Sequence, residues 1–142
     1  MAALMSLSDE ETDHSPSPRR RPRRRLPSIV RVLDETGDAV CPHCTVAGTA
    51  WTRMRGLLGR DGLAEDEGLL IEPAPSVHMF FMRFAIDVVF LDKNRRIVGL
   101  AHTLRPWRVA GARKAVAALE LPAGTAVKHG LELGDILTFE PA

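Results

Sequence analysis

The feature that most constrains the fold is a succession of short apolar runs, each closed by a turn, between residues 68 and 140. The runs are rich in β-branched and aromatic residues, which is typical of strands. They are GLLIE, SVHMFF, IDVVFLD, RIVGLAHTL, AALEL and DILTFE. Because several short strands at close spacing favour a closed or curled sheet, we predict a mainly β (α+β) fold, a small barrel-like or rolled antiparallel/mixed sheet.

Three turns are predicted around these strands. DETGD joins a strand at residues 29–33 to a return strand that begins at Ala39. DKNRR, with Asn94 in the left-handed conformation, makes a tight hairpin between two later strands. Near the C-terminus Gly134 allows a sharp reversal, and the Asp135 carboxylate can accept backbone N–H groups there.

One segment, AGTAWTRMRGLLGR, has a helical period instead. Its apolar residues recur at the spacing of one helical face: Trp51, Met54, Leu57 and Leu58. Thr49 is a suitable N-cap, and Gly59 or Gly62 would end the helix. We predict one principal helix here, which covers an open end or face of the sheet.

Residues 1–28 differ in composition from the rest of the chain. They carry four acidic residues and then six arginines between Arg19 and Arg25, with prolines at 16, 18, 22 and 27. No apolar period is available to offset the entropy of ordering them, so we predict a disordered, basic, Pro-rich tail. Residues 29–142 are then a single globular domain. The arginine run is either solvated or contacts nucleic acid, an anionic surface or a protein partner.

The tail does not have the order of a secretory signal, because its arginines follow the short apolar stretch and no apolar core comes after them. No segment approaches the roughly 18 uninterrupted apolar residues of a membrane span. We therefore expect a cytoplasmic protein.

From about Trp51 to Thr138 the sequence resembles the domain of unknown function 192 family. The resemblance is carried by a helical segment with R-x-x-GLLGR, a Phe/Met-rich stretch leading to IDVVFLD, then LELPAG and GLxxGD. It implies a compact, mainly β domain and no established activity. The commoner form of the middle motif reads W-M-K-N-T-x-x-P-L-D-I-x-F. Asp87 matches its Asp and Met79 its Met, whereas His78 replaces the Trp and Ala85 the Pro.

Asp87 is the ionisable residue that the strand pattern makes most conspicuous. Alternation places it on one face of its strand with Val89 and Leu91, so it needs hydrogen bonds or a counter-charge. Arg83 and the backbone N–H groups of residues 82–85 are the local candidates. Either Asp87 locks a turn, or it acts at a pocket as a ligand-binding or acid/base group. Glu120, in the apolar strand AALEL, would pair with it only in the second case.

The stretch HMFFM predicts a surface beside Asp87. Ser76, His78 and Phe80 share one face of an extended strand, so half of this apolar stretch points away from the core. The predicted helix covers that half, or it lines a groove for an apolar ligand or peptide. The candidate ligand-binding residues are His78, Met79, Phe81, Asp87, Trp107 and Glu120.

Two further motifs have structural and functional interpretations. CPHC, from Cys41 to Cys44, is a pair of ordinary reduced thiols at a strand end, half of a zinc site, or a redox pair. TVAG separates it from the predicted helix and the chain has no second cysteine pair, so we favour reduced thiols. His78, His102 and His129 lack a short metal-binding spacing, and we assign no metal or cofactor.

The sequence thus indicates a non-enzymatic ligand- or partner-binding or accessory module. One alternative is an enzyme that uses Asp87 with Glu120 or a histidine as acid/base groups or metal ligands. The other is a nucleic-acid-binding protein, which would use the basic tail and the loop from Arg105 to Lys114, where Trp107 lies among arginines. We assign no catalytic residue.

Overall fold

The structure, a computed structural model, describes residues 29–47, 60–80 and 82–142. Within them nine strands and one short helix follow one another along the chain. They are β1 (Ile29–Leu33), β2 (Ala39–Ala47), β3 (Glu67–Ile71), β4 (Ser76–His78), β5 (Ile86–Leu91), β6 (Ile97–Leu104), β7 (Val109–Gly111), β8 (Ala117–Pro122), α2 (Thr125–Lys128) and β9 (Thr138–Pro141). The predicted tail (1–28), almost all of the predicted helix (49–59) and Phe81 lie outside the described residues.

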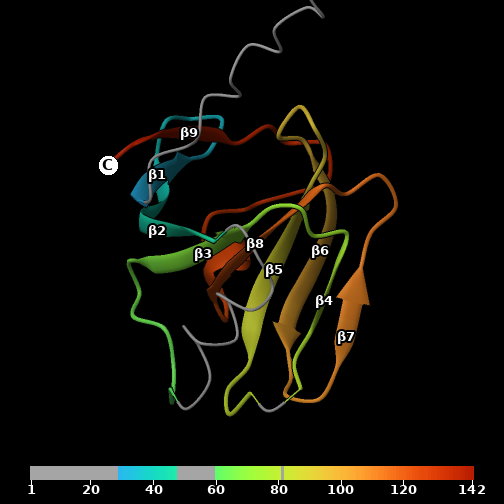
Figure 1. The fold of residues 1–142 in the computed structure, drawn as a ribbon. Helices are drawn as coiled ribbons and strands as arrows, with labels where there is room; N and C mark the ends of the chain where they lie inside the picture. The colour runs from blue at the N-terminus through green and yellow to red at the C-terminus, as the bar shows by residue number, and fades with distance from the viewer. Residues whose placement is uncertain (1–28, 48–59, 81) are drawn as a thin grey trace, which may run out of the picture.

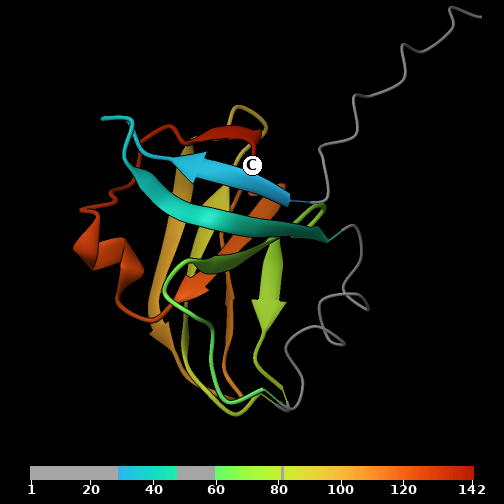
Figure 2. The same cartoon turned by 90° about the vertical axis from the view of Figure 1, so that its left-hand side faces the viewer.

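Seven strands form one sheet in the order β6-β5-β8-β3-β2-β1-β9 (Figure 1). Among the described strands only β2 and β3 pair in parallel, so the sheet is mixed. The strands β4 and β7 form a separate antiparallel pair, the β4–β7 ribbon. In Figure 2 the sheet is strongly curled, and β1 and β2 cross over the remaining strands. The mainly β, rolled and mixed fold predicted from the sequence is confirmed.

The two edges of the large sheet meet at one end without closing it. An isolated bridge joins Arg96 to Ile136. Beside it the Ile97 N–H donates to the Asp135 carbonyl at 2.8 Å, and the Leu137 N–H donates to the Arg95 carbonyl at 3.0 Å. Because β6 and β9 remain the edge strands, the described part of the sheet is open rather than a closed barrel.

Two apolar cores lie on the two faces of the sheet. The strand β5, which lies next to the edge strand β6, is buried along its whole length and contributes alternate residues to each core. The helix-side core includes Val89, Leu91, Leu119, Leu121 and, from α2, Ala126. The ribbon-side core includes Ile86, Val88, Phe90, Ala118 and, from the ribbon segment, Val77 and Met79. Accordingly α2 and β4 lie on opposite sides of the sheet (Figure 2).

The predicted turns form, with one correction. Asp135 accepts the Glu132 N–H at 3.0 Å beside Gly134, whose φ is 95°. In the β5–β6 hairpin, however, Arg95 takes the left-handed conformation, with φ of 64°, and Asn94 does not. The cause is Asp92, whose Oδ1 accepts the N–H groups of Asn94 at 2.8 Å and of Arg96 at 3.0 Å. These bonds, that from Arg96 above all, hold the pKa of Asp92 below its ordinary value.

Among the described residues, the structure has no helix with the length and apolar character needed to cross a membrane.

Candidate functional site

An aromatic row, made of His78, Phe80 and Trp107, runs along the ribbon. The ring centroids of His78 and Phe80 lie 4.9 Å apart with an interplanar angle of 31°. Those of Phe80 and Trp107 lie 5.9 Å apart at 32°. These are separations of interacting aromatic rings. Trp107, at the end of the row, is 59% exposed and Phe80 is 41% exposed, so the row presents ring surface to solvent.

Backbone pairing fixes the position of the row. His78 pairs with Val109 across the ribbon, and alternation turns Val77 and Met79 into the ribbon-side core. Beyond the paired residues, the Met79 N–H donates to the Arg108 carbonyl and the Trp107 N–H donates to the Met79 carbonyl, both at 2.8 Å. Two main-chain bonds therefore hold the Trp107 segment against the strand that carries the other two rings.

The turn that carries Trp107 has an unusual residue at its tip. The Arg108 N–H donates to the Arg105 carbonyl at 3.3 Å, so Pro106 and Trp107 are the two central residues. Trp107 has a φ of 69°. Proline at the second position and a positive φ at the third are features of a type II turn, in which the third residue is usually glycine.

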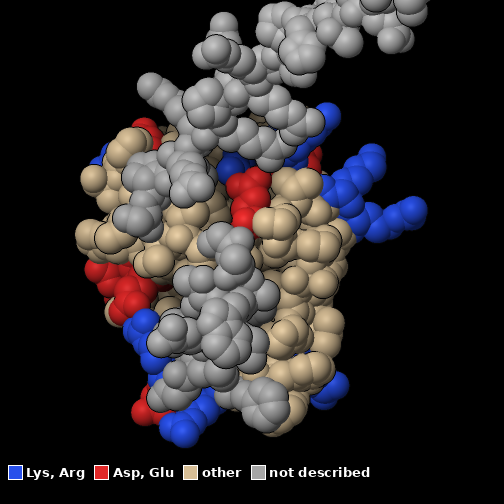
Figure 3. Space-filling model, viewed as in Figure 1, with Lys and Arg blue, Asp and Glu red and all other residues tan. Residues whose placement is uncertain are grey.

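The surface over the ribbon is uncharged and has basic margins. Figure 3 shows a continuous area without charged side chains over β4 and β7, with Lys and Arg side chains at its upper and lower right borders. Val109 is 62% exposed and extends the apolar surface beyond the aromatic row. Three arginines close to the ribbon along the chain are exposed: Arg83 follows β4, and Arg105 and Arg108 precede β7.

Asp87 lies on the helix-side face of β5 and is 1% exposed. Its Oδ1 accepts the Thr103 N–H at 2.8 Å. Its Oδ2 accepts the N–H groups of Gly124 at 3.0 Å and of Ala126 at 2.9 Å. The carboxylate thus joins the end of β6 to the β8–α2 turn. Of the two interpretations drawn from the sequence, this geometry agrees with the turn-locking one.

The partners of Asp87 differ from those expected locally. Instead of the N–H groups of residues 82–85, it uses N–H groups brought by two other segments. Arg83, the other local candidate, forms an ion pair with Asp61, in which its Nη1 lies 3.9 Å from Oδ1. Thr103 occupies an irregularity in the β5–β6 register and has a φ of 50°, so its N–H leaves the strand ladder and turns to the carboxylate.

Glu120 is fully buried on the other face of the sheet. Val88 pairs with Glu120 and Asp87 pairs with Leu121, and directly paired residues share a face. Asp87 and Glu120 therefore point to opposite cores. The sequence hypothesis that these two carboxylates meet in one pocket is wrong, because adjacent positions of paired strands alternate between faces.

The structure brings together only some of the predicted site residues. His78 and Trp107 meet through Phe80, a residue that alternation from His78 already pointed to. Met79 is buried beneath the row, and Asp87 and Glu120 lie elsewhere. In the part of the chain that the structure describes, no three His, Cys, Asp or Glu side chains are grouped as metal ligands would be.

Cys41 and Cys44 are buried and free, and lie within β2 rather than at its end. A bulge pairs them with Val32 and Val30, so both thiols face the helix-side core. Their shared hydrogen bond lowers the pKa of Cys41 and raises that of Cys44. The predicted strand-end position is corrected because β2 continues to Ala47 to pair with β3.

Comparison of the sequence with models of protein families shows the family of the chain. Residues 31–139 match the model of the DUF192 family, described as "Uncharacterized ACR". The chain belongs to the DUF192 family. The resemblance predicted from residues 51–138 is thereby confirmed, and the match extends it to β1 and to the cysteine motif of β2.

Relatives of this DUF192 chain include archaeal UPF0127 proteins. The one from Thermococcus kodakarensis is 39% identical over 120 residues, which are 78% of this chain and 73% of the relative. The one from Thermococcus sibiricus is 41% identical over 68 residues, 46% of this chain and 42% of the relative. The one from Pyrococcus furiosus is 44% identical over 65 residues, 45% of this chain and 55% of the relative. The aligned part is thus less than two thirds of the last two proteins.

Two crystal structures share the fold of this DUF192 chain. One, from Sinorhizobium meliloti 1021, has a TM-score of 0.67 at 24% identity and covers 78% of this chain and 92% of its own. The other, a protein of unknown function from Novosphingobium aromaticivorans DSM 12444, has a TM-score of 0.66 at 24% identity and covers 78% and 83%. At this identity the likeness concerns the fold alone.

Proposed function

We propose that this DUF192 chain is a non-enzymatic binding module whose ligand packs on the aromatic row, and that the ligand is a single-stranded nucleic acid. The observation that carries the proposal is Trp107. It presents 59% of its surface to solvent from a turn position with a φ of 69°. A non-glycine residue held in such a conformation costs about 1–3 kcal/mol, so folding stability alone would favour glycine there.

The charges beside the row support an anionic ligand with flat rings. Arg105 and Arg108 flank the tip of the turn and are exposed. Aromatic side chains stack on bases of any sequence, while guanidinium groups bind the phosphates between them. A neutral sugar or an apolar peptide would use the rings and leave the arginines without a role.

The arrangement of carboxylates supports binding over acid–base catalysis. Both oxygens of Asp87 accept backbone N–H groups from inside the fold, so neither is directed at a substrate. Glu120 lies beneath the opposite face of the same strand pair. A general acid and base must both reach the reacting group, and these two do not share a pocket.

The test is fluorescence anisotropy with labelled oligo(dT) and oligo(rU) of about 12 nucleotides, a length within the usual range of single-strand sites. We expect the Trp107→Gly variant to bind at least about fivefold more weakly, because base stacking accounts for about 1–3 kcal/mol per base. Its melting temperature should be unchanged or higher, because glycine suits the turn. Affinity of the parent protein should fall as salt rises.

Two variants serve as controls. Trp107→Phe keeps a ring and should keep most of the affinity. Lys114→Gly relieves another positive φ, of 65°, at the far end of the same basic loop and removes no ring. It should gain stability in the same way while losing only the contribution of one charge. Equal binding by Trp107→Gly and the parent protein, or absence of binding at about 50 mM salt, would contradict the proposal. Binding of a neutral oligosaccharide in place of the oligonucleotides would show that the ligand class is wrong.

A further inference from the structure

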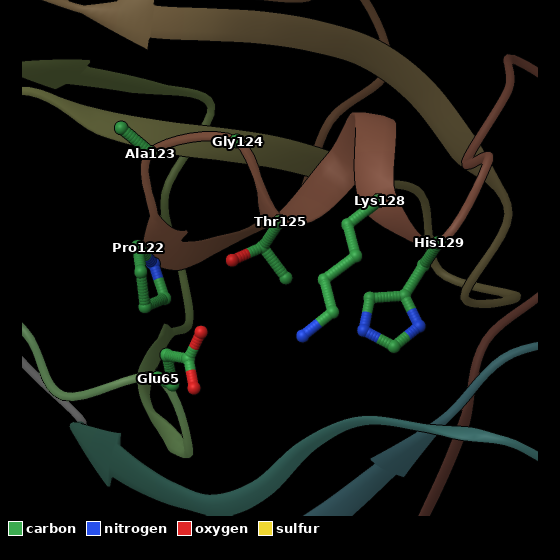
Figure 4. A pocket seen from close by; sticks show the side chains of 7 residues that line it. All are labelled: Glu65, Pro122, Ala123, Gly124, Thr125, Lys128 and His129. Atoms are coloured by element: carbon green, nitrogen blue, oxygen red, sulfur yellow. The ribbon is translucent and has the colours of Figure 1, made fainter.

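A small recess lies on the helix side of the sheet, away from the ribbon. Its volume is about 180 Å³, and the open recess is bordered by the β8–α2 turn and by Glu65, which precedes β3. The side chains of Thr125, Lys128 and His129 line it from α2 and its end. Figure 4 shows the carboxylate of Glu65 on one side of this space and the ammonium group of Lys128 and the imidazole of His129 on another.

The opposite charges of the recess do not neutralise each other directly. Although Glu65 and Lys128 both line it, no ion pair within 4.0 Å joins these two described residues. The Thr125 hydroxyl also points into the space (Figure 4), on a residue that is 8% exposed. The recess therefore offers an acceptor on one side and donors on the other, which suits a ligand that carries both charges.

The wall of the recess is held from behind by Asp87. The N–H groups of Gly124 and Ala126 donate to its carboxylate, away from the recess. Those amides are thus not available to a ligand, and recognition falls to the side chains. The same bonds fix the turn that carries Thr125, so the hydroxyl is positioned before a ligand arrives.

The volume limits the size of the ligand. A space of about 180 Å³ is below the ~300 Å³ at which drug-sized sites begin. We propose that the recess binds a small zwitterion, a free α-amino acid. Its carboxylate meets Lys128 and Thr125, and its ammonium group meets Glu65. The site does not depend on the aromatic row, which lies on the other side of the sheet.

The test compares L-alanine and two of its derivatives as probes, by ¹⁵N–¹H correlation spectra of the full chain. L-Alanine carries both charges, N-acetyl-L-alanine lacks the ammonium group, and L-alaninamide lacks the carboxylate. We expect L-alanine to shift the amide signals of Thr125 and Lys128 saturably. Each of the other two probes, which carries only one of the two charges, should bind about tenfold more weakly or worse, because charge-assisted hydrogen bonds are lost.

Variants assign each end of the ligand. Glu65→Gln should weaken L-alanine and L-alaninamide but leave N-acetyl-L-alanine unchanged. Lys128→Met should weaken L-alanine and N-acetyl-L-alanine but leave L-alaninamide unchanged. Lys93→Met is the matched control, because Lys93 lines a different recess of about 280 Å³ together with Asp92 and Lys114. It should change none of the three affinities.

Three results would overturn the inference. The first is an absence of shifts in the amide signals of Thr125 and Lys128 at about 20 mM L-alanine. A site with a dissociation constant of about 1 mM would be almost saturated at that concentration. The second is equal affinity for the three probes, which would mean that the recess recognises neither the ammonium group nor the carboxylate. The third is an equal loss of affinity in Lys93→Met, which would mean that net charge alone is responsible.

Discussion

At the scale of single residues, Asp87 shows how a buried charge is accommodated. The alternation of its strand correctly placed it on the face of Val89 and Leu91, where a carboxylate needs partners. The partners are three backbone N–H groups from residues 16, 37 and 39 positions away in sequence. No local pattern could have indicated them, because they are brought to Asp87 by strand pairing.

We predict that Asp87→Asn destabilises the fold by about 3 kcal/mol, because the new NH₂ group would face backbone N–H groups that now donate to a charged oxygen. The matched control is Asp92→Asn. There both N–H groups donate to the same Oδ1, which asparagine retains, and the residue is only partly buried. The control should leave the denaturant midpoint almost unchanged. The measurement is the denaturant midpoint of each variant, and equal losses in the two would be evidence against a locking role.

At the scale of elements, the β4–β7 ribbon depends on its contact with the sheet. Two isolated strands are marginally stable, so the apolar side of the ribbon must be buried. Val77 and Met79 provide this burial. Gly99 in β6 allows the close approach, because a Cβ placed there would lie 2.5 Å from the Cβ of Ala112 and 3.2 Å from the ring of Phe90.

A compensating pair of substitutions tests this contact. We predict that Gly99→Ala costs about 1–3 kcal/mol, the usual range for overpacking, and speeds amide exchange of Val109 and Gly111 in β7. Ala112→Gly removes the nearer methyl group, so the double variant should be more stable than the sum of the two single effects. Denaturation of all four proteins gives the coupling, and strictly additive effects would mean that the two residues do not touch.

At the scale of the whole molecule, the curled sheet separates two surfaces of different character. The ribbon side presents aromatic rings and exposed arginines, and the helix side presents a small recess lined by charges of both signs. The two share no side chain, and buried strands lie between them.

We therefore predict that the two proposed sites act independently. Trp107→Gly should leave the affinity for L-alanine within about twofold, and Lys128→Met should leave the affinity for oligonucleotides within about twofold, since separate sites without shared partners behave additively. The measurement is titration of each ligand against both variants and with the other ligand saturating. A change of about fivefold or more in either direction would reveal coupling through the sheet.

The sequence by itself determined the β class, the first hairpin, the β5–β6 turn, the C-terminal reversal and the face on which each residue of β5 lies. These depend on two-residue periodicity and on turn chemistry, which act over a few positions. Only the tertiary structure decided that β2 pairs with β3 in parallel, that Asp87 and Glu120 face opposite cores, and that Glu65 and Lys128 line one recess. Those relations depend on which strands become neighbours, and pairing between distant segments leaves no mark in the local pattern.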